Sequence, residues 1–217
     1  MWCLSPRCYR YYGGRDRRMF TTRVLGRDDR ETMATAGLLA AAAAAEGRPA
    51  TVIPASGAGI ALCVIGGGGV AKEEGSAMAD ALIAANLGPP VADALIAADP
   101  GALCRADAFA RLSPEAYVLV NSACGFGDLG LAGQVERFCR DRTLILPAER
   151  LQPGPHDAVS RGAGLAGGFA ALCRVVGLGA VVRAIEDSVP GDRAPACAQT
   201  AAAAYEFVLA EKQALAA

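Results

Sequence analysis

From residue 19 onward, short apolar runs alternate with stretches of helical pattern. The runs that predict strands lie at 22–26, 50–66, 92–99, 117–121 and 143–148, and most of the chain from 165 to 215 has helical pattern. Strands that alternate with helices form βαβ units around a mostly parallel sheet. The order therefore predicts an α/β fold, a single three-layer domain with a mostly parallel sheet and a helical C-terminal part, over residues 19–217.

Some of these segments allow two interpretations. The run 50–66 is either a strand pair or one interrupted strand. The near-identical stretches ADALIAAN (79–86) and ADALIAAD (92–99) differ in their flanking prolines, which favour a helix for the first and a buried parallel strand for the second. A short apolar run on its own fits either state.

Helices are expected in four further places. One runs from Gly101 to a turn at Ser113-Pro114, and a short one covers 134–141 after a glycine-rich loop. The C-terminal part divides at its glycines and prolines into three helices, predicted at 165–176, 179–188 and 195–215.

The segment from Thr21 to Gly47 predicts a strand, a turn and a long alanine-rich helix. A glycine-rich, phosphate-binding loop usually occupies such a turn in α/β proteins. Here the turn is Arg27-Asp28-Asp29-Arg30-Glu31. Asp28 is a helix cap with Glu31 three residues later, and Gly47 ends the helix. Three acidic side chains place negative charge where an anion would bind, so the turn favours a protein partner over a phosphate.

The chain offers few groups for catalysis. His156 is the single histidine, which excludes a two-histidine metal site, and beside Asp157 in a proline-rich loop we expect a structural role for it. The eight cysteines contain no CxxC pair and are expected to be reduced thiols, with Cys63 and Cys173 in the core. GFGDLG (125–130) matches GxGxxG but lies late in the chain, so we interpret it as a surface loop.

Composition limits the partners and the compartment. A formal net charge of −1 gives no reason to expect nucleic acid or an anionic membrane as partner. No run reaches the roughly 20 strongly apolar residues that a membrane span requires. The N-terminus lacks a secretory apolar region, so a cytoplasmic protein is expected.

Residues 1–18 differ from the rest, with five arginines against one aspartate and three of the five tyrosines. They form a disordered or partner-docking arm, a nucleic-acid tail that stacks bases on its aromatic rings, or an untranslated stretch upstream of a true start at Met19. Because the whole chain is nearly neutral, an arm lying on another subunit or a mis-set start is preferred.

Four segments, in order, resemble the gamma subunit of the 2-oxoacid:ferredoxin oxidoreductases, the pyruvate, 2-oxoglutarate and indolepyruvate class. VLGRDDRETMATAGLLAAAAAAEGRPA (24–50) is similar to the family's opening GRGGQG segment, and SGAGIALCVI (56–65) to its RGAPV strand. The family's central segment is similar to VADALIAADPGAL with LSPEAYVLVNS (91–122). Its closing segment is similar to RGAGLAGGFAALCRVVGLGAVVRAIED (161–187).

The resemblance implies a subunit without its own cofactor. Thiamine diphosphate and Mg would be held by partner alpha and beta subunits, and iron–sulfur clusters by a ferredoxin-like subunit, with coenzyme A as a possible co-substrate. Such a chain would order the complex and complete its cleft, and would be inactive alone. The remaining hypotheses are a diverged stand-alone α/β binding module and a nucleotide-dependent oxidoreductase acting alone, which the acidic turn opposes.

The chain departs from the family at its most characteristic positions. Asp28-Asp29-Arg30-Glu31 replaces the GGQG turn, Ser56 replaces an arginine, and the preceding loop is shortened to Pro54-Ala55. Arg27, Gly57 and Asn121 match as residues. The candidate interface or site-lining residues are thus Gly26, Arg27, Asp28, Asp29, Arg30, Ser56, Gly57 and Asn121.

Overall fold

The computed structural model describes residues 19–55, 59–66, 91–105, 107–151 and 157–216. Several predictions lie outside the described residues: the arm 1–18, the helix 79–86, and the positions of Ser56, Gly57 and His156. Among the described residues, no helix combines the length and apolarity needed to span a bilayer.

The described strands form one mixed sheet of six, in the order β2-β3-β1-β4-β5-β6. Four strands run parallel to one another, and β2 and β3 form an antiparallel hairpin on β1. The strands are β1 (Phe20–Leu25), β2 (Ala50–Ala55), β3 (Ile60–Ile65), β4 (Ala92–Ala97), β5 (Leu112–Asn121) and β6 (Thr143–Leu146). The α/β prediction is confirmed, the segment 50–66 is a strand pair, and ADALIA after the prolines is a parallel strand.

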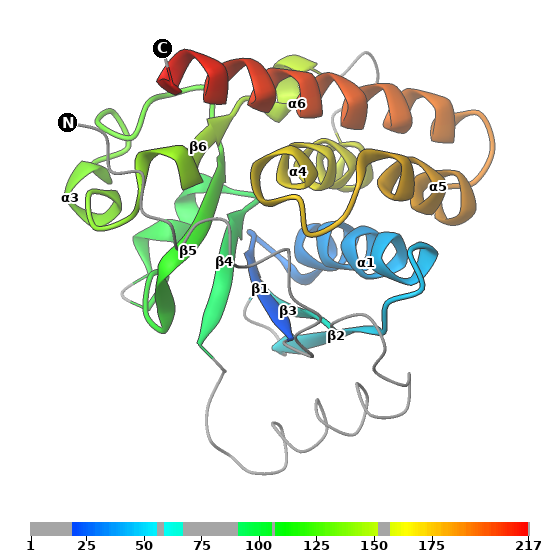
Figure 1. Cartoon of the computed structure of the whole chain (residues 1–217), viewed down its shortest axis with the longest axis horizontal. Coiled ribbons are helices and arrows are strands. Elements are labelled where there is room, and N and C mark those ends of the chain that lie inside the picture. The colour runs from blue at the N-terminus through cyan, green and yellow to red at the C-terminus, as the bar shows by residue number, and fades with distance from the viewer. Residues whose placement is uncertain (1–18, 56–58, 67–90, 106, 152–156, 217) are drawn as a thin grey trace, which may run out of the picture.

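Four long helices lie on one side of the sheet, two of them packed against the strands and two mainly on those helices (Figure 1). They are α1 (Asp29–Ala45), α4 (Ala158–Cys173), α5 (Leu178–Ser188) and α6 (Arg193–Ala216). The side chains of Leu39, Ile96, Leu119 and Phe169 are fully buried between these helices and the sheet. Burial of side chains of this size contributes about 1.5–3 kcal/mol each, which makes this apolar layer the main stabilising element.

Helix α6 crosses α4 at very close range. A Cβ atom on Gly167 of α4 would lie 2.1 Å from the carbonyl oxygen of Ala201 in α6. No side chain fits at this crossing, so glycine is required for the outer helix to pack.

The other face of the sheet carries a thinner layer of short helices and turns. The 3-10 helix η1 (Pro100–Cys104) and helix α3 (Ala132–Val135) lie in this layer. Leu103, Leu131 and Phe138 from these segments are buried against the apolar side chains of β4 and β5. The sheet is thus the middle of three layers.

The helix predicted from Gly101 is wrong, because the chain leaves η1 and continues in turns to Arg111. The cause lies in β1. The buried Arg23 donates to the carbonyl oxygens of Asp107 (2.9 Å) and Ala110 (3.2 Å), and its Nη2 donates to the Asp107 carboxylate at 2.9 Å. A guanidinium from a distant strand takes carbonyls that an α-helix would have bonded internally.

Three smaller differences concern element boundaries. Ser113 and Pro114 lie within β5, where the pairing with β4 skips from Leu112 to Tyr117, so the predicted turn is a bulge. The helix predicted at 134–141 is replaced by α3 and the 3-10 helix η2 (Arg140–Arg142). Helix α4 starts seven residues before the predicted position, since the Asp157 side chain caps it by accepting from Ser160 N at 2.9 Å.

Candidate functional site

The candidate site lies where the parallel strands β1, β4, β5 and β6 end. In open α/β sheets, ligands bind beyond the carboxyl ends of the strands. A cavity of about 370 Å³ is present there. Its lining residues come from the segments that follow these strands and from α4: Arg27, Ala98, Asp99, Pro100, Asn121, Ser122, Ala123, Glu149 and Arg161.

The turn between β1 and α1 is closed by its own carboxylates. Asp28 Oδ1 accepts from Glu31 N at 3.0 Å, which confirms the predicted helix cap. The Glu31 side chain turns back and accepts from Arg27 N at 2.9 Å. Asp29 Oδ1 accepts from Gly59 N at 3.1 Å and so joins the turn to the β2–β3 hairpin. Protein carboxylates thus occupy two amide donors of this turn, Arg27 N and Glu31 N, that a phosphate would use.

Gly26 and Gly59 allow the hairpin to approach the turn closely. Gly59 has a φ of +58°, and a Cβ atom there would lie 2.5 Å from the Gly26 carbonyl oxygen. Gly26 N donates to Gly59 O at 2.9 Å. Gly26 therefore serves the packing of the turn, and its predicted role toward a partner stays a prediction.

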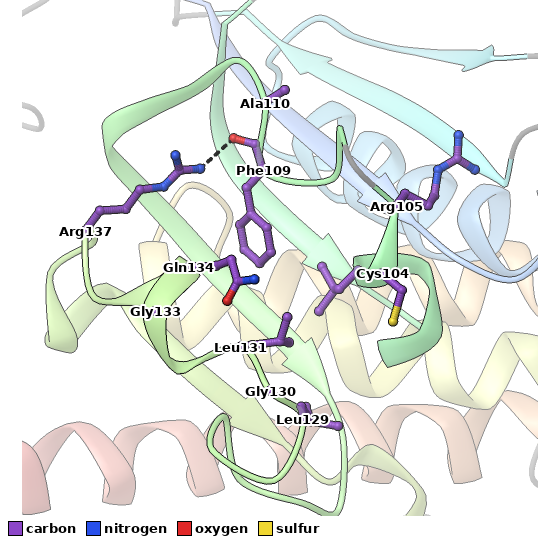
Figure 2. A pocket seen from close by; sticks show the side chains of 11 residues that line it. Cys104, Arg105, Phe109, Ala110, Leu129, Gly130, Leu131, Gly133, Gln134 and Arg137 are labelled. Atoms are coloured by element: carbon purple, nitrogen blue, oxygen red, sulfur yellow. Dashed lines mark hydrogen bonds between the residues drawn. The ribbon is translucent and has the colours of Figure 1, made fainter.

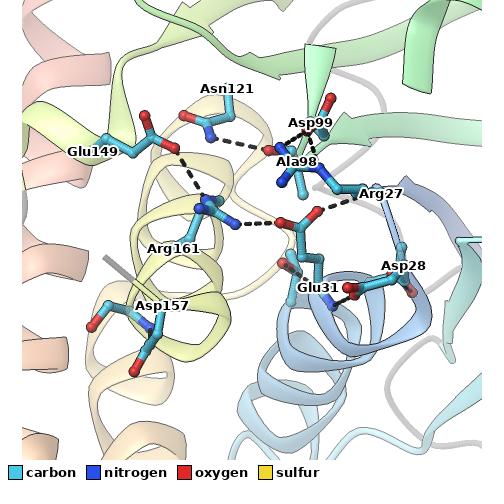
Figure 3. Close-up of polar contacts among 12 residues, drawn as sticks. Arg27, Asp28, Glu31, Ala98, Asp99, Asn121, Glu149, Asp157 and Arg161 are labelled. Carbon is cyan, nitrogen blue, oxygen red and sulfur yellow. Dashed lines mark hydrogen bonds and ion pairs between the residues drawn. The ribbon is translucent and has the colours of Figure 1, made fainter. Parts of the chain in front are cut away.

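Glu31 is the centre of a buried charge network (Figure 3). Its side chain is only 8% exposed, and its Oε1 pairs with Nη1 of Arg161 from α4, whose side chain is 16% exposed. Arg161 Nε also lies 3.4 Å from Glu149 Oε1, an ion pair without hydrogen-bond geometry. The network joins the first turn of α1 to the first turn of α4 and to η3 (Ala148–Leu151).

A second ion pair lies at the mouth of the cavity. Arg27 Nε and Nη2 donate to Asp99 Oδ2 at 3.1 and 2.7 Å, while the Arg27 side chain remains 75% exposed. The hydrogen bond to Asp99 and its charge raise the pKa of Arg27 above its usual range. Asp99 Oδ1 also caps η1 by accepting from Gly101 N at 2.7 Å. Arg27 is therefore an exposed cation that is oriented by its ion pair with Asp99.

Asn121 connects three strand ends. Its Nδ2 donates to Ala98 O at 3.0 Å, after β4, and its Oδ1 accepts from Ala148 N at 3.1 Å, after β6. The side chain is buried and lines the cavity. Both amide atoms are thus used within the chain, and the visible role of Asn121 is to hold the floor of the site in place.

The structure brings together most of the predicted site residues. Five of them lie around the carboxyl ends of the parallel strands, as Figure 3 shows for those that it labels: Gly26, Arg27, Asp28, Asp29 and Asn121. Arg30 is exposed in the same turn.

Sequence reasoning missed Asp99, Glu149 and Arg161. Asp99 and Glu149 follow β4 and β6, and the rule that parallel strands end at one edge offered a signal for them. Arg161 belongs to a helix 130 residues from Glu31, and nothing local indicates that pairing.

The site's chemistry is that of a neutral, internally paired cluster. The cavity lining holds two arginines and two carboxylates, so its positive and negative charges balance. Within the described part of the chain, no cluster of three metal-ligating side chains occurs. The arrangement resembles neither an activated nucleophile with its base nor a metal centre. Its visible effect is to hold the strand ends and the starts of α1 and α4 in place.

No protein-family model matches the sequence, and no curated protein sequence matches it. Several solved structures share the fold, among them the following two. Subunit PORC of pyruvate oxidoreductase from Thermotoga maritima has a TM-score of 0.64 and 18% identity, covering 88% of this chain and 97% of that one. The gamma subunit of keto/oxoacid ferredoxin oxidoreductase from Geobacter sulfurreducens has a TM-score of 0.60 and 18% identity, covering 88% of this chain and 99% of that one. The likeness predicted from the four sequence segments is confirmed at the level of the fold.

Proposed function

We propose that this chain is a gamma-type subunit of a complex that oxidatively decarboxylates a 2-oxoacid and passes the electrons to ferredoxin or a related acceptor. The observation that carries the proposal is the fold shared with two such subunits over 97% and 99% of their lengths. Four sequence segments resemble the family in the same order, which supports the proposal independently of the fold.

The chemistry in this proposal belongs to the partner subunits. Thiamine diphosphate and Mg are assigned to alpha and beta subunits, iron–sulfur clusters to a ferredoxin-like subunit, and coenzyme A is a co-substrate where the reaction forms a thioester. The matched charges of the cavity support a structural role for this chain, because none of them is left as an activated group. Its role is to order the assembly and complete the cleft, and alone it is inactive.

The turn after β1 is the proposed contact with the partners. Arg27 is 75% exposed yet held in direction by Asp99. Arg30 is exposed beside it. Asp28 and Asp29 are exposed between these cations, so the turn is a mixed-charge surface on which the complementary charges of a partner would set register.

Affinity purification of the tagged chain from its native cell tests the proposal. We expect subunits that bind thiamine diphosphate and iron–sulfur clusters to copurify, together with 2-oxoacid-dependent reduction of methyl viologen. Arg30→Glu should weaken copurification at least about tenfold, a loss of roughly 1.4 kcal/mol. The matched control is Arg183→Glu, at an exposed arginine of α5. Recovery of the tagged chain without these subunits contradicts the proposal.

One observation favours a second candidate, a stand-alone α/β binding module without catalytic activity. Two amide donors of the turn are filled by Asp28 and Glu31, and Asp29 binds the hairpin, so the chain differs from the glycine-rich turn of the family it resembles. A module that had left the complex would be free to close this turn. The same purification separates the two candidates, because a stand-alone module would elute free of cofactor-binding subunits.

A further inference from the structure

A second cavity lies on the opposite face of the sheet from the long helices. It has a volume of about 650 Å³ and lies between the turns at 103–110 and the loop at 129–137 (Figure 2). This size falls within the range of about 300–1,000 Å³ typical of small-molecule sites. The GFGDLG motif, which the sequence analysis interpreted as a surface loop, ends in its wall at Gly130.

Apolar side chains form one part of the lining of this cavity, beside polar groups such as Gln134. Leu103, Phe109, Leu129 and Leu131 line it, and Figure 2 shows the Phe109 ring and Leu131 near its centre. Apolar walls of this kind favour a ligand with a hydrocarbon or aromatic body, because its burial removes apolar surface from water.

The charged side chains that line the cavity are both arginines. Arg105 and Arg137 belong to the lining, and no aspartate or glutamate does among the described residues. Arg105 Nε forms an ion pair with Asp107 at 3.6 Å, outside the lining. Arg137 is therefore the lining cation on which the proposal below depends.

Arg137 is held in a fixed orientation. Its Nη2 donates to Phe109 O at 2.7 Å, across the cavity wall, as Figure 2 shows. Its guanidinium carbon lies 4.8 Å from the centre of the Phe138 ring and 5.8 Å from that of Phe109. One of its five N–H groups is used in this way, and within the described part of the chain the others make no hydrogen bond. A preorganised guanidinium binds a planar carboxylate through two parallel hydrogen bonds.

Gly133 leaves one wall of the cavity open. It lies within the short helix α3, where glycine is less favourable than alanine by about 1 kcal/mol. A Cβ atom there would meet nothing within 4 Å. Neither backbone conformation nor packing requires glycine, so a larger side chain can be added from this wall without disturbing the fold.

We propose that this cavity binds a small organic acid with an apolar body, whose carboxylate pairs with Arg137 and whose body contacts Phe109 and the leucines. The site lies on the sheet face away from the long helices, whereas the turn assigned to the partner subunits lies at the ends of the strands. It does not depend on the proposed function.

Isothermal titration of the full chain with 4-phenylbutyrate, phenylacetate and hexanoate tests this assignment, with 4-phenylbutanamide as the uncharged control. We expect at least one acid to bind with a dissociation constant below about 1 mM, and the amide at least tenfold more weakly than 4-phenylbutyrate. Arg137→Gln should reduce acid affinity at least tenfold. Gly133→Leu should abolish binding while leaving the thermal midpoint within a few degrees of the parent.

Arg183→Gln, on the other side of the molecule, is the matched control and should bind as the parent does. The assignment is overturned if all three acids fail to bind, if the acid and its amide bind equally, or if Gly133→Leu binds as the parent. It is also overturned if a folded Arg137→Gln variant keeps its affinity.

Discussion

Replacing Glu31 with glutamine tests the charge network that joins α1 to α4. Both carboxylate oxygens of Glu31 are bonded, one to Arg27 N at 2.9 Å and the other to Arg161. In the Glu31→Gln variant, an amide NH₂ faces one of these donors, so a donor meets a donor. The Arg161 charge, 16% exposed, then keeps only the looser contact with Glu149.

The expected loss follows from this burial. Removing one partner of a buried ion pair costs about 3–5 kcal/mol. Since Arg161 is partly exposed and retains Glu149, we expect about 2–3 kcal/mol for Glu31→Gln. For a chain of 217 residues this lowers the thermal midpoint by about 4–12 °C. Urea unfolding followed by circular dichroism measures the loss directly.

Two further variants separate the network from a general effect of substitution. Glu149→Gln removes a carboxylate that is 57% exposed, so it should cost less than about 1 kcal/mol. The double variant Glu31→Gln/Arg161→Met leaves neither charge of this ion pair buried without its partner. It should therefore be at least about 1 kcal/mol more stable than the summed losses of Glu31→Gln and Arg161→Met predict. A Glu31→Gln loss below about 0.5 kcal/mol, or strict additivity, refutes the reasoning.

Three other predictions follow from the same structure. Hydrogen bonding to Arg23 lowers the pKa of Asp107, so the stabilisation from this pair is present above about pH 4 and is lost as pH falls through the lowered pKa. Asp107→Asn should cost only about 1 kcal/mol of unfolding free energy at pH 7, because solvent screens the exposed pair. The same variant should flatten the acid limb of a stability–pH curve. Gly167→Ala should cost more than about 2 kcal/mol in urea unfolding, because its Cβ would meet Ala201, whereas Gly179→Ala, with nothing within 4 Å, should be neutral or stabilising. Iodoacetamide under native conditions at pH 8 should label the exposed thiols of Cys104 and Cys124 and spare the buried thiols of Cys63 and Cys173, as mass mapping would show. Burial raises the pKa of both buried thiols to about 12. Equal labelling, an unaltered acid limb, or a tolerated Gly167→Ala would each contradict the corresponding argument.

The sheet could be predicted because its strands are short apolar runs bounded by glycine, proline or charge. Prolines on both sides of 92–97 favoured a strand there over a helix. The first helix was equally clear, since Asp28 and Gly47 mark its two ends. These features are local, and local sequence is sufficient for them.

Other features depend on contacts between distant residues. The segment after Gly101 has helical pattern, yet Arg23, about 80 residues earlier, takes its carbonyls. Glu31 was identified as a helix-start residue, but its pairing with Arg161 joins two helices that only the fold brings together. Asn121 was chosen through a resemblance, and its role as a link between strand ends became visible only with the neighbours Ala98 and Ala148 in place.

The most direct test of the account is the native size of this chain in an extract of its own cells. Size-exclusion chromatography with immunodetection of the chain measures it without overexpression or a tag. The account predicts elution within a large assembly that coelutes with 2-oxoacid-dependent reduction of methyl viologen. Elution of the chain as a 22.1 kDa monomer, apart from that activity, would contradict it.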